Sequence, residues 1–180
     1  MKRLGILILL IGLVGCAGSL LPVPGDIIET TSKFDGSRQI SIEPAWVGNS
    51  IKLTLFKNTK MPVNDIILTV VVRGARLFAK GNSLHFNVDG KIVSFKSIDR
   101  LTDIKTSSGF AGGGYYIPPS NWSSKAYVVG KSFIKRIIAA NRVVVKIDLT
   151  KTYVEGVFSK DGYTRARPAF KKFYARLKTL

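Results

Sequence analysis

The chain has 180 residues, with 28 Lys and Arg against 11 Asp and Glu, so its formal net charge is +17. Hydrophobic residues make up 46%, which excludes a disordered chain, and the length fits one domain with a core that needs no disulfides. The single Cys and the single His, His85, exclude an intrachain disulfide, a cysteine-based zinc cluster and every site that needs two imidazoles. These counts remove most enzyme classes and leave a large positive charge to be explained.

The first residues have the layout of a secretory signal peptide: Lys2 and Arg3, then an apolar run over residues 4–13. The run ends in Leu13-Val14-Gly15-Cys16. This segment resembles the lipobox of bacterial lipoproteins, which implies cleavage before Cys16 and acylation of the Cys16 thiol.

An uncleaved membrane helix over residues 4–21 is the alternative, since that stretch is long enough to span a bilayer. Four glycines within it, and the spacing of Cys16 from the aliphatic residues, favour the lipoprotein. Loss of residues 1–15 would leave a charge of +15, because only Lys2 and Arg3 are removed from the 28 cations. Several acyl chains would hold the protein permanently in a lipid bilayer. Ala17 follows Cys16, where lipoproteins kept in the inner membrane commonly carry Asp, so the resemblance implies the periplasmic face of an outer membrane.

The sequence predicts three parts: a signal peptide over 1–15, a lipidated tether over 16–33, and a single domain over 34–180. Two prolines and two glycines interrupt the second part, which favours an irregular tether. Strand patterns dominate the domain. We expect strands at 38–42, 51–55, 66–72, 84–88, 91–98, 126–129, 142–149 and 153–158.

Two of these strands carry stronger signals. Residues 66–72 are almost all aliphatic or β-branched, which predicts a central strand covered on both faces. Asp89-Gly90 separates two strand patterns and predicts a tight hairpin. In residues 51–55 the alternation places Lys52 and Thr54 outward.

Two helices are expected, at about 132–141 and 165–178. Ser132 is the predicted N-cap of the first, and Pro168 suits the first turn of the second. Each helix has one apolar face to pack on the sheet. The fold class is therefore α+β, a mainly antiparallel sheet with both helices on one face. Residues 105–124, rich in glycine and aromatics, are expected to form a long loop, either functional or a solvated excursion.

The chemical motifs are incomplete. Gly130-Lys131-Ser132 resembles the end of a P-loop, but Lys125 stands where that loop needs glycine. His85 is the one base for a Ser-His-Asp hydrolase, and the chain has no Gly-x-Ser-x-Gly elbow. Asp99 and Asp103 are expected in salt bridges with Arg100 and Lys105. We expect no catalytic residue, no metal and no cofactor.

The late charge is the remaining signal. A basic surface is expected on or beside the second helix, formed by Arg165, Arg167, Lys171, Lys172, Arg176 and Lys178. It is either an ordinary solvated helix face or a docking surface for anionic lipid, lipopolysaccharide phosphates or an acidic envelope protein. Export makes nucleic acid an unsuitable partner. The favoured hypothesis is a non-catalytic envelope lipoprotein that docks on such a surface. An accessory subunit of an envelope complex is the alternative, and a hydrolase whose acids converge only in three dimensions is the third.

Overall fold

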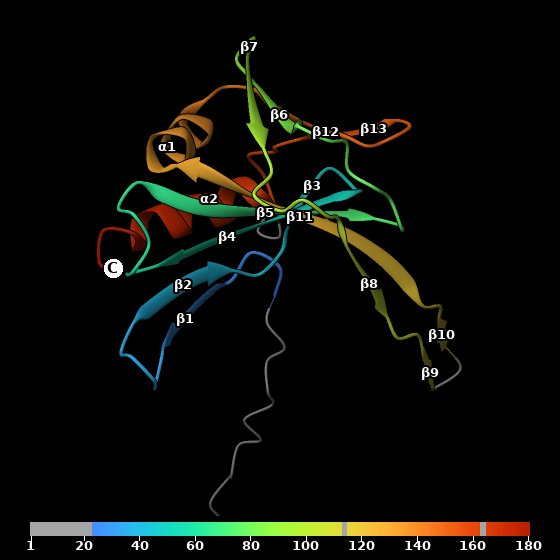
Figure 1. Cartoon of the computed structure of the whole chain (residues 1–180), viewed down its shortest axis with the longest axis horizontal. Coiled ribbons are helices and arrows are strands. Elements are labelled where there is room, and N and C mark those ends of the chain that lie inside the picture. The colour runs from blue at the N-terminus through green and yellow to red at the C-terminus, as the bar shows by residue number, and fades with distance from the viewer. Residues whose placement is uncertain (1–22, 113–114, 163–164) are drawn as a thin grey trace, which may run out of the picture.

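The computed structural model describes residues 23–112, 115–162 and 165–180. The predicted signal peptide and lipobox, Cys16 included, lie outside these residues. The described residues fold into two antiparallel sheets, two helices and a small two-stranded ribbon (Figure 1).

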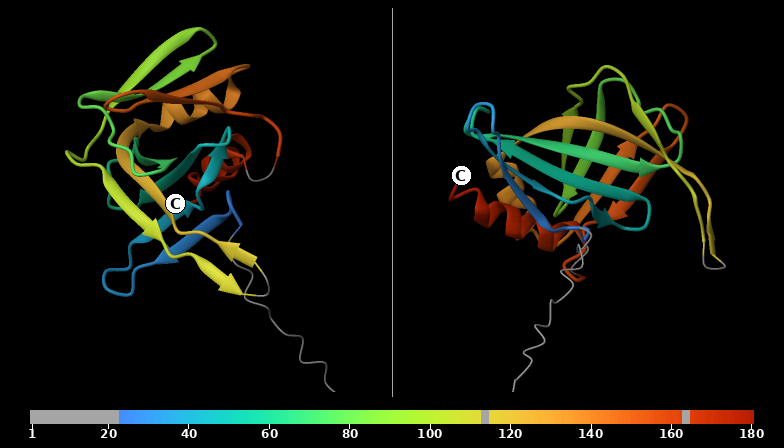
Figure 2. Two further views of the ribbon diagram at one scale, coloured as in Figure 1. Left: turned by 90° about the vertical axis from the view of Figure 1, so that its right-hand side faces the viewer. Right: turned by 90° about the horizontal axis from the view of Figure 1, so that it is seen from below.

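The larger sheet has the strand order β1-β2-β4-β5-β11-β8, with β3 beside β4. The bounds are Ile27–Thr31 for β1, Arg38–Ile42 for β2, Ala45–Val47 for β3, Ile51–Asn58 for β4, Asp65–Arg73 for β5, Asp103–Ser107 for β8 and Ser120–Gly130 for β11. The sheet is strongly curled (Figure 2).

The smaller sheet has the order β13-β12-β6-β7. Its strands are β6 (Asn82–Val88), β7 (Lys91–Lys96), β12 (Val143–Asp148) and β13 (Tyr153–Val157). The predicted hairpin between β6 and β7 is confirmed: Asp89 has φ +49° and Gly90 φ +89°, the left-handed pair that a two-residue turn requires.

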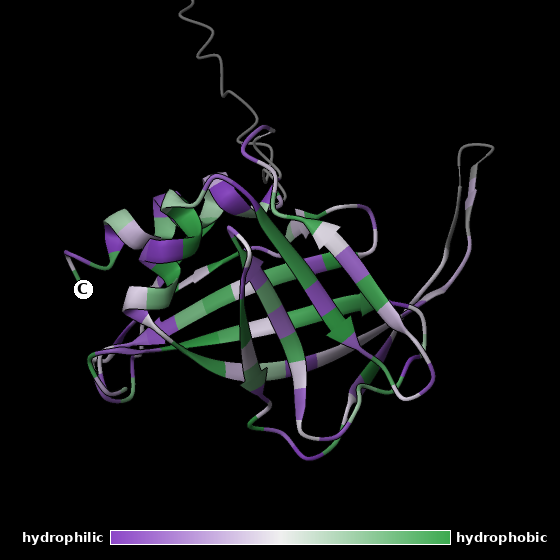
Figure 3. Cartoon of the chain, turned by 90° about the horizontal axis from the view of Figure 1, so that it is seen from above, coloured by the Kyte–Doolittle hydropathy of each residue, from purple (hydrophilic) through white to green (hydrophobic). Residues whose placement is uncertain are grey.

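The core lies between the two sheets, because most of their strands turn alternate residues inward (Figure 3). In β4, Leu53 and Leu55 are fully buried, whereas Lys52 and Thr54 are half-buried on the outer face, as predicted. A buried hydrogen bond of 2.8 Å joins the Tyr127 hydroxyl of β11 to Ser83 of β6, and burial raises the pKa of Tyr127 to about 12. This bond links the two sheets inside the core.

β5 is central, between β4 and β11, as predicted. The prediction that both its faces are covered is wrong. Its inward residues are buried, but the outward Ile67, Thr69 and Val71 are only half-buried. An antiparallel sheet needs one packed face, and its aliphatic outer positions can remain partly solvated.

The helices are α1 (Lys131–Ala139) and α2 (Ala166–Arg176), which lie side by side at one end of the molecule (Figures 1 and 3). The α1 residue Phe133 packs edge-on against Phe86 of β6, with 5.1 Å between ring centroids. Phe170 of α2 packs in the same way on Phe158, which follows β13, at 5.2 Å. The α+β fold with two helices on one side of a mainly antiparallel sheet is confirmed.

The predicted N-cap of α1 is wrong. Gly130 is the N-cap, with no side-chain cap, and Ser132 lies exposed in the first turn. β11 runs directly into the helix, and the N–H of Lys131 donates to the Asn64 carbonyl at 2.8 Å instead of to a capping side chain.

Two regions differ from the prediction. Residues 27–31, expected in the tether, form β1, because Ile27 pairs with Ile42 and packs on the core. Residues 105–124, expected as a long loop, are mostly strand: β8 pairs with the start of β11, and β9 (Phe110–Gly112) pairs with β10 (Tyr115–Ile117). This arm projects from the body of the molecule (Figures 1 and 3).

Candidate functional site

Segments 131–142 and 165–180, which contain α1 and α2, hold ten Lys and Arg and no Asp or Glu. The apolar residues of each helix face the core, so most of these cations point away from it. We call the exposed surface formed by Lys135, Arg136, Arg142, Lys171, Lys172 and Lys178 the basic helix face. None of these six side chains forms an ion pair within the described residues.

Of the six predicted binding residues, three are exposed without an ion pair among the described residues, and three bind other parts of the protein. Lys171, Lys172 and Lys178 are exposed. Arg176 is exposed but paired, with its Nε 3.3 Å from the Glu29 carboxylate of β1. Arg165 is half-buried and donates from Nη1 to the Gly48 carbonyl at 2.5 Å, which ties the start of α2 to the turn between β3 and β4.

Arg167 lies in the core, only 5% exposed, and does not belong to the surface on which it was predicted. Its Nη1 donates to the carbonyl of Ala140 at 2.9 Å, and its guanidinium lies 5.5 Å from the centre of the Phe158 ring. Within the described residues, its Nε and Nη2 have no partner. Burial lowers the pKa of Arg167, and the nearby Asp89 carboxylate opposes that effect.

The contact with Ala140 explains why a cation is buried there. Ala140 is the C-cap of α1, and a cation at a helix C-terminus interacts favourably with the helix dipole. Arg167 therefore binds the end of α1 to the beginning of α2. A spacing signal existed in the sequence, since Arg167 stands three residues before the buried Phe170 and so lies close to its face of the helix.

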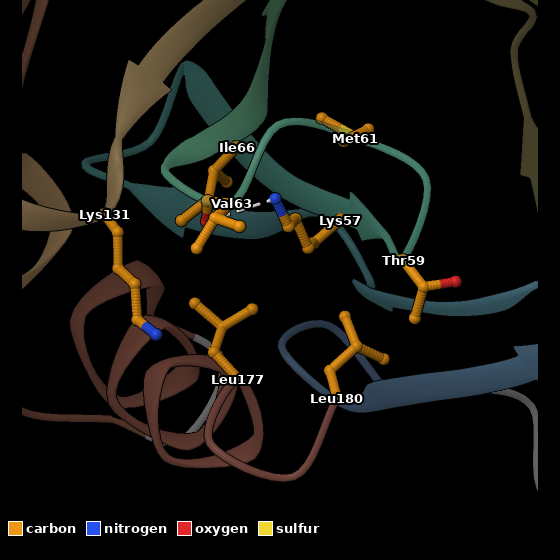
Figure 4. Close-up of a pocket in the computed structure, with 8 residues that line it drawn as sticks. All are labelled: Lys57, Thr59, Met61, Val63, Ile66, Lys131, Leu177 and Leu180. Carbon is orange, nitrogen blue, oxygen red and sulfur yellow. Dashed lines mark hydrogen bonds between the residues drawn. The ribbon is translucent and has the colours of Figure 1, made fainter.

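A cavity of about 250 Å³ lies at one edge of the helices, between Leu177 and Leu180 on one side and the loop before β5 on the other (Figure 4). Lys57 and Lys131 line it together with apolar side chains. The Lys57 ammonium donates to the carbonyls of residues 62, 63 and 65 at 2.5, 3.3 and 2.9 Å. Burial lowers the pKa of Lys57, Asp65 raises it, and Lys131 lowers it further.

Lys57 thus serves to hold the loop, and Lys131 is the cation that reaches into the cavity (Figure 4). The cavity is therefore a small, largely apolar recess that lies beside the basic helix face.

A second polar cluster lies on the outer face of the smaller sheet, and sequence reasoning missed it. His85 bonds through Nδ1 to the Ser94 hydroxyl at 2.7 Å and through Nε2 to Asp148 at 2.9 Å. Burial raises the pKa of Asp148, but hydrogen bonds from Lys146 and His85 outweigh it and leave that pKa lowered. The Lys146 ammonium lies 3.1 Å from the same carboxylate.

The residue types match a Ser-His-Asp hydrolase, and their contacts are those of cross-strand pairs. The hairpin register, fixed by Asp89-Gly90, already places His85 opposite Ser94. Asp148 arrives from β12, and no local signal announces that β12 pairs with β6. The Asp148 carboxylate binds both His85 and Lys146. The cluster is therefore a polar network that joins β6, β7 and β12.

A third cluster lies on the outer face of the larger sheet. The Lys52 ammonium lies 4.5 Å from the centre of the Trp46 ring and 4.3 Å from that of Trp122. Burial between them lowers the pKa of Lys52. The outward direction of Lys52 was predicted, but its two aromatic partners come from β3 and β11, far apart in sequence.

The predicted pairing of the two aspartates is found for one of them. Asp103 lies 3.6 Å from Lys105. Asp99 accepts the N–H of Ala126 at 3.1 Å and forms no ion pair within the described residues. Across the described ranges, no three His, Cys, Asp or Glu side chains are placed to hold a metal ion. Neither α1 nor α2 is long and apolar enough to cross a membrane.

Comparison with family models, curated proteins and solved structures gives no match for this chain. The interpretation of the site therefore depends on its own residues.

Proposed function

We propose that the protein is a lipid-anchored, non-catalytic envelope protein that docks on an anionic membrane surface through its basic helix face. One observation carries the proposal: six exposed cations, without an acid in either segment, lie on two adjacent helices or within three residues of their ends. Each Lys or Arg near an anionic surface contributes about 1 kcal/mol. This face therefore attracts an anionic partner by its charge and not by a complementary shape.

The mode of binding follows from packing. Phe133 and Ile137 of α1, and Phe170 and Phe173 of α2, are buried in the core, so the helices have no free apolar stripe to insert into lipid. Binding is therefore electrostatic and falls with salt, because the field decays within roughly 8 Å at physiological ionic strength. Amphipathic membrane helices, which insert an apolar face, behave differently.

The lipobox resemblance supports the same location. Eleven residue steps separate Cys16 from Ile27, where β1 begins, and a fully extended chain of that length spans at most roughly 40 Å. A domain tethered so closely stays near the bilayer. Because Ala17 follows Cys16, the periplasmic face of an outer membrane is the proposed site.

The docking test compares two charge variants in the full-length chain carrying Cys16→Ser, which removes the proposed acylation site. The first variant replaces Lys171, Lys172 and Lys178 by Gln. The matched control replaces three exposed cations outside the basic helix face, Lys33, Arg73 and Lys151, by Gln. Binding is measured by co-sedimentation with equimolar phosphatidylcholine–phosphatidylglycerol vesicles and with phosphatidylcholine alone.

The parent chain should prefer the anionic vesicles and lose that preference as salt rises. The helix-face variant should bind them at least about tenfold more weakly, since three contributions of about 1 kcal/mol are removed. The control should lose much less. Equal binding of both variants, or equal binding to neutral and anionic vesicles, overturns the proposal. Salt-sensitive binding only to lipopolysaccharide or to an acidic envelope protein would assign the same face to a different partner and also overturn the lipid docking.

The anchor has its own measurement. Cells expressing the wild-type chain should incorporate labelled fatty acid into the protein, and Cys16→Ser should abolish incorporation and leave an unprocessed precursor. Continued labelling of the variant contradicts the lipoprotein proposal.

An accessory subunit of an envelope complex is the second candidate, favoured by the free side of β8. This strand is the edge of the larger sheet, every residue of it is exposed, and Ile104 is 43% exposed. Unpaired edges are templates for strand addition. A stoichiometric partner that stays bound at high salt would favour this candidate over lipid docking.

A further inference from the structure

A second group of cations surrounds a pocket of about 460 Å³. The pocket lies at the end of the β6–β7 hairpin that is opposite to its turn. Three chain segments meet there: the residues before β6, the residues after β7 and the middle of β11. The charged side chains that line it are Lys80, Lys96, Asp99, Arg100 and Lys125. The pocket shares no residue with the basic helix face.

Lys125 is the unusual member of this group. It occupies an inward position of β11, between Ser123 and Tyr127, both fully buried, and is itself only 5% exposed. Its Nζ is not among the buried side-chain atoms without a partner, so the alkyl stem is covered while the ammonium reaches the open space of the pocket. Within the described residues, its ammonium has neither an ion pair nor a hydrogen bond, and its side chain lines the pocket.

The one acid of the pocket does not balance this charge. Asp99 uses Oδ2 to accept the N–H of Ala126 at 3.1 Å. Four cations against one carboxylate leave a lining charge of +3. Lys80, Lys96 and Arg100 also lack ion pairs among the described residues. Like charges held around one space repel each other unless an anion lies between them.

We infer that this pocket is a binding site for a phosphate group, free or carried by a larger molecule. Arg100 offers the planar, forked donors that match phosphate oxygens, and the lysines supply compact charges. A pocket of about 460 Å³ has room for a phosphate and part of the molecule that bears it. The site is independent of the proposed membrane docking.

In the sequence, Lys125 is notable only because it breaks a P-loop pattern. The structure gives the position a different meaning: Lys125 itself faces the space that an anion would fill. A nucleotide-binding loop is not part of this site, because the donors are side chains from three segments and not the backbone of one glycine-rich turn.

The test measures inorganic phosphate binding to the full-length Cys16→Ser chain by calorimetry and by thermal denaturation, at constant ionic strength set with chloride. Lys125→Met keeps the apolar length of the side chain and removes its charge. Lys33→Met is the control, an exposed lysine that does not line the pocket. Lys96→Gln and Arg100→Gln are exposed positions whose replacement leaves the core intact.

Phosphate should bind the parent saturably and raise its melting temperature, as any ligand of the native state does. Lys125→Met should bind at least about tenfold more weakly, yet melt no lower than the parent without phosphate, because Met keeps the covered part of the side chain and removes a charge that the other cations of the pocket repel. The two exposed variants should each weaken binding, and the control should not. Absence of saturable binding in the parent, or equal affinity in the parent, Lys96→Gln and Arg100→Gln, overturns the inference, even if Lys125→Met fails to fold.

Two further arms identify the source of the phosphate. Vesicles of phosphatidylcholine with phosphatidic acid present the group on a lipid, and glycerol 3-phosphate presents it in solution. Loss of the remaining vesicle binding when Lys96→Gln is added to the Lys171, Lys172 and Lys178 variant assigns a lipid headgroup, because that variant already lacks the proposed docking through the helix face. Competition by glycerol 3-phosphate alone assigns a soluble ligand. Because the helix-face variant keeps this pocket, its failure to bind lipid and the failure of phosphate binding are separate results.

Discussion

The inner and outer sides of the helix pair use the same kind of side chain in opposite ways. Outside, Lys171 and Lys172 display their charges to solvent with no acid in the segment. Inside, one turn before Lys171, Arg167 is only 5% exposed. Its guanidinium donates a hydrogen bond to the Ala140 carbonyl at the end of α1. The comparison shows that a count of basic residues overstates the charge available to a partner, because a cation can instead hold two helices together.

The largest expected effect comes from the inner side. Arg167→Ala removes the hydrogen bond to Ala140, the contact with Phe158 and most of a buried side chain, and leaves a cavity. Substitutions that truncate buried side chains cost about 2–5 kcal/mol. We expect the free energy of unfolding to fall by about 2–4 kcal/mol, measured by urea denaturation.

Arg167→Met sharpens that comparison. It fills the space and removes the two unpartnered nitrogens, so it should destabilise much less than alanine. It should also leave vesicle binding unchanged, since the charge it removes is buried. A loss of vesicle binding in the folded Met variant would return Arg167 to the basic surface and break the distinction between the two sides.

The position of Arg167 shows where sequence reasoning stopped. The helix itself was predictable, because Phe170 and Phe173 repeat at helical spacing and Pro168 fits its first turn. Arg167, however, lies at the margin of the buried face, where periodicity alone does not decide between core and solvent. The end of α1 covers it, and that contact depends on how two segments twenty-seven residues apart pack together.

The fold divides in the same way. The β6–β7 hairpin followed from Asp89-Gly90, and the outward direction of Lys52 followed from alternation, since both are local signals. The arm of β8, β9 and β10 was missed because its glycines and prolines suggest a loop, while long-range pairing with β11 makes β8 a strand. The phosphate pocket was beyond prediction for the same reason: Lys80, Arg100 and Lys125 come from three segments.

A smaller effect is expected from Asp89, the acid that faces the end of the helix pair. Its carboxylate accepts the N–H groups of Asn141 at 3.1 Å and Arg142 at 2.7 Å, just after α1. The bond from Arg142 is the main cause that lowers the pKa of Asp89. A carboxyl whose pKa is lower in the folded state stabilises the fold above its unfolded pKa, and this contribution is lost as pH falls through the folded value.

Asp89→Asn should therefore be less stable than wild type at neutral pH. The gap should begin to close below about pH 4, where an ordinary aspartate becomes protonated, and vanish as the pH falls through the lower folded pKa of Asp89. Denaturation midpoints of both chains from pH 7 to pH 2.5 measure this. A gap that stays constant over that range would show that the charge of Asp89 does not contribute, and that its hydrogen bonds are equally strong from a neutral side chain.

The smallest effect is expected on the outer side, and it decides whether the vesicle experiment can be interpreted. Replacing Lys171, Lys172 and Lys178 by Gln removes favourable cations from the C-terminal half of α2, which costs stability through the helix dipole. It also relieves repulsion among the cations of this segment, which returns stability. Both terms are a few tenths of a kcal/mol, and the three side chains are exposed, so the free energy of unfolding should change by less than about 0.5 kcal/mol.

Denaturation at low and high salt measures the balance between these two terms. Salt screens the repulsion, so any gain in stability should appear at low salt and shrink as salt rises. A loss of more than about 1 kcal/mol would mean that these lysines support the fold, and the outer side of the helix pair would then resemble the inner side rather than contrast with it.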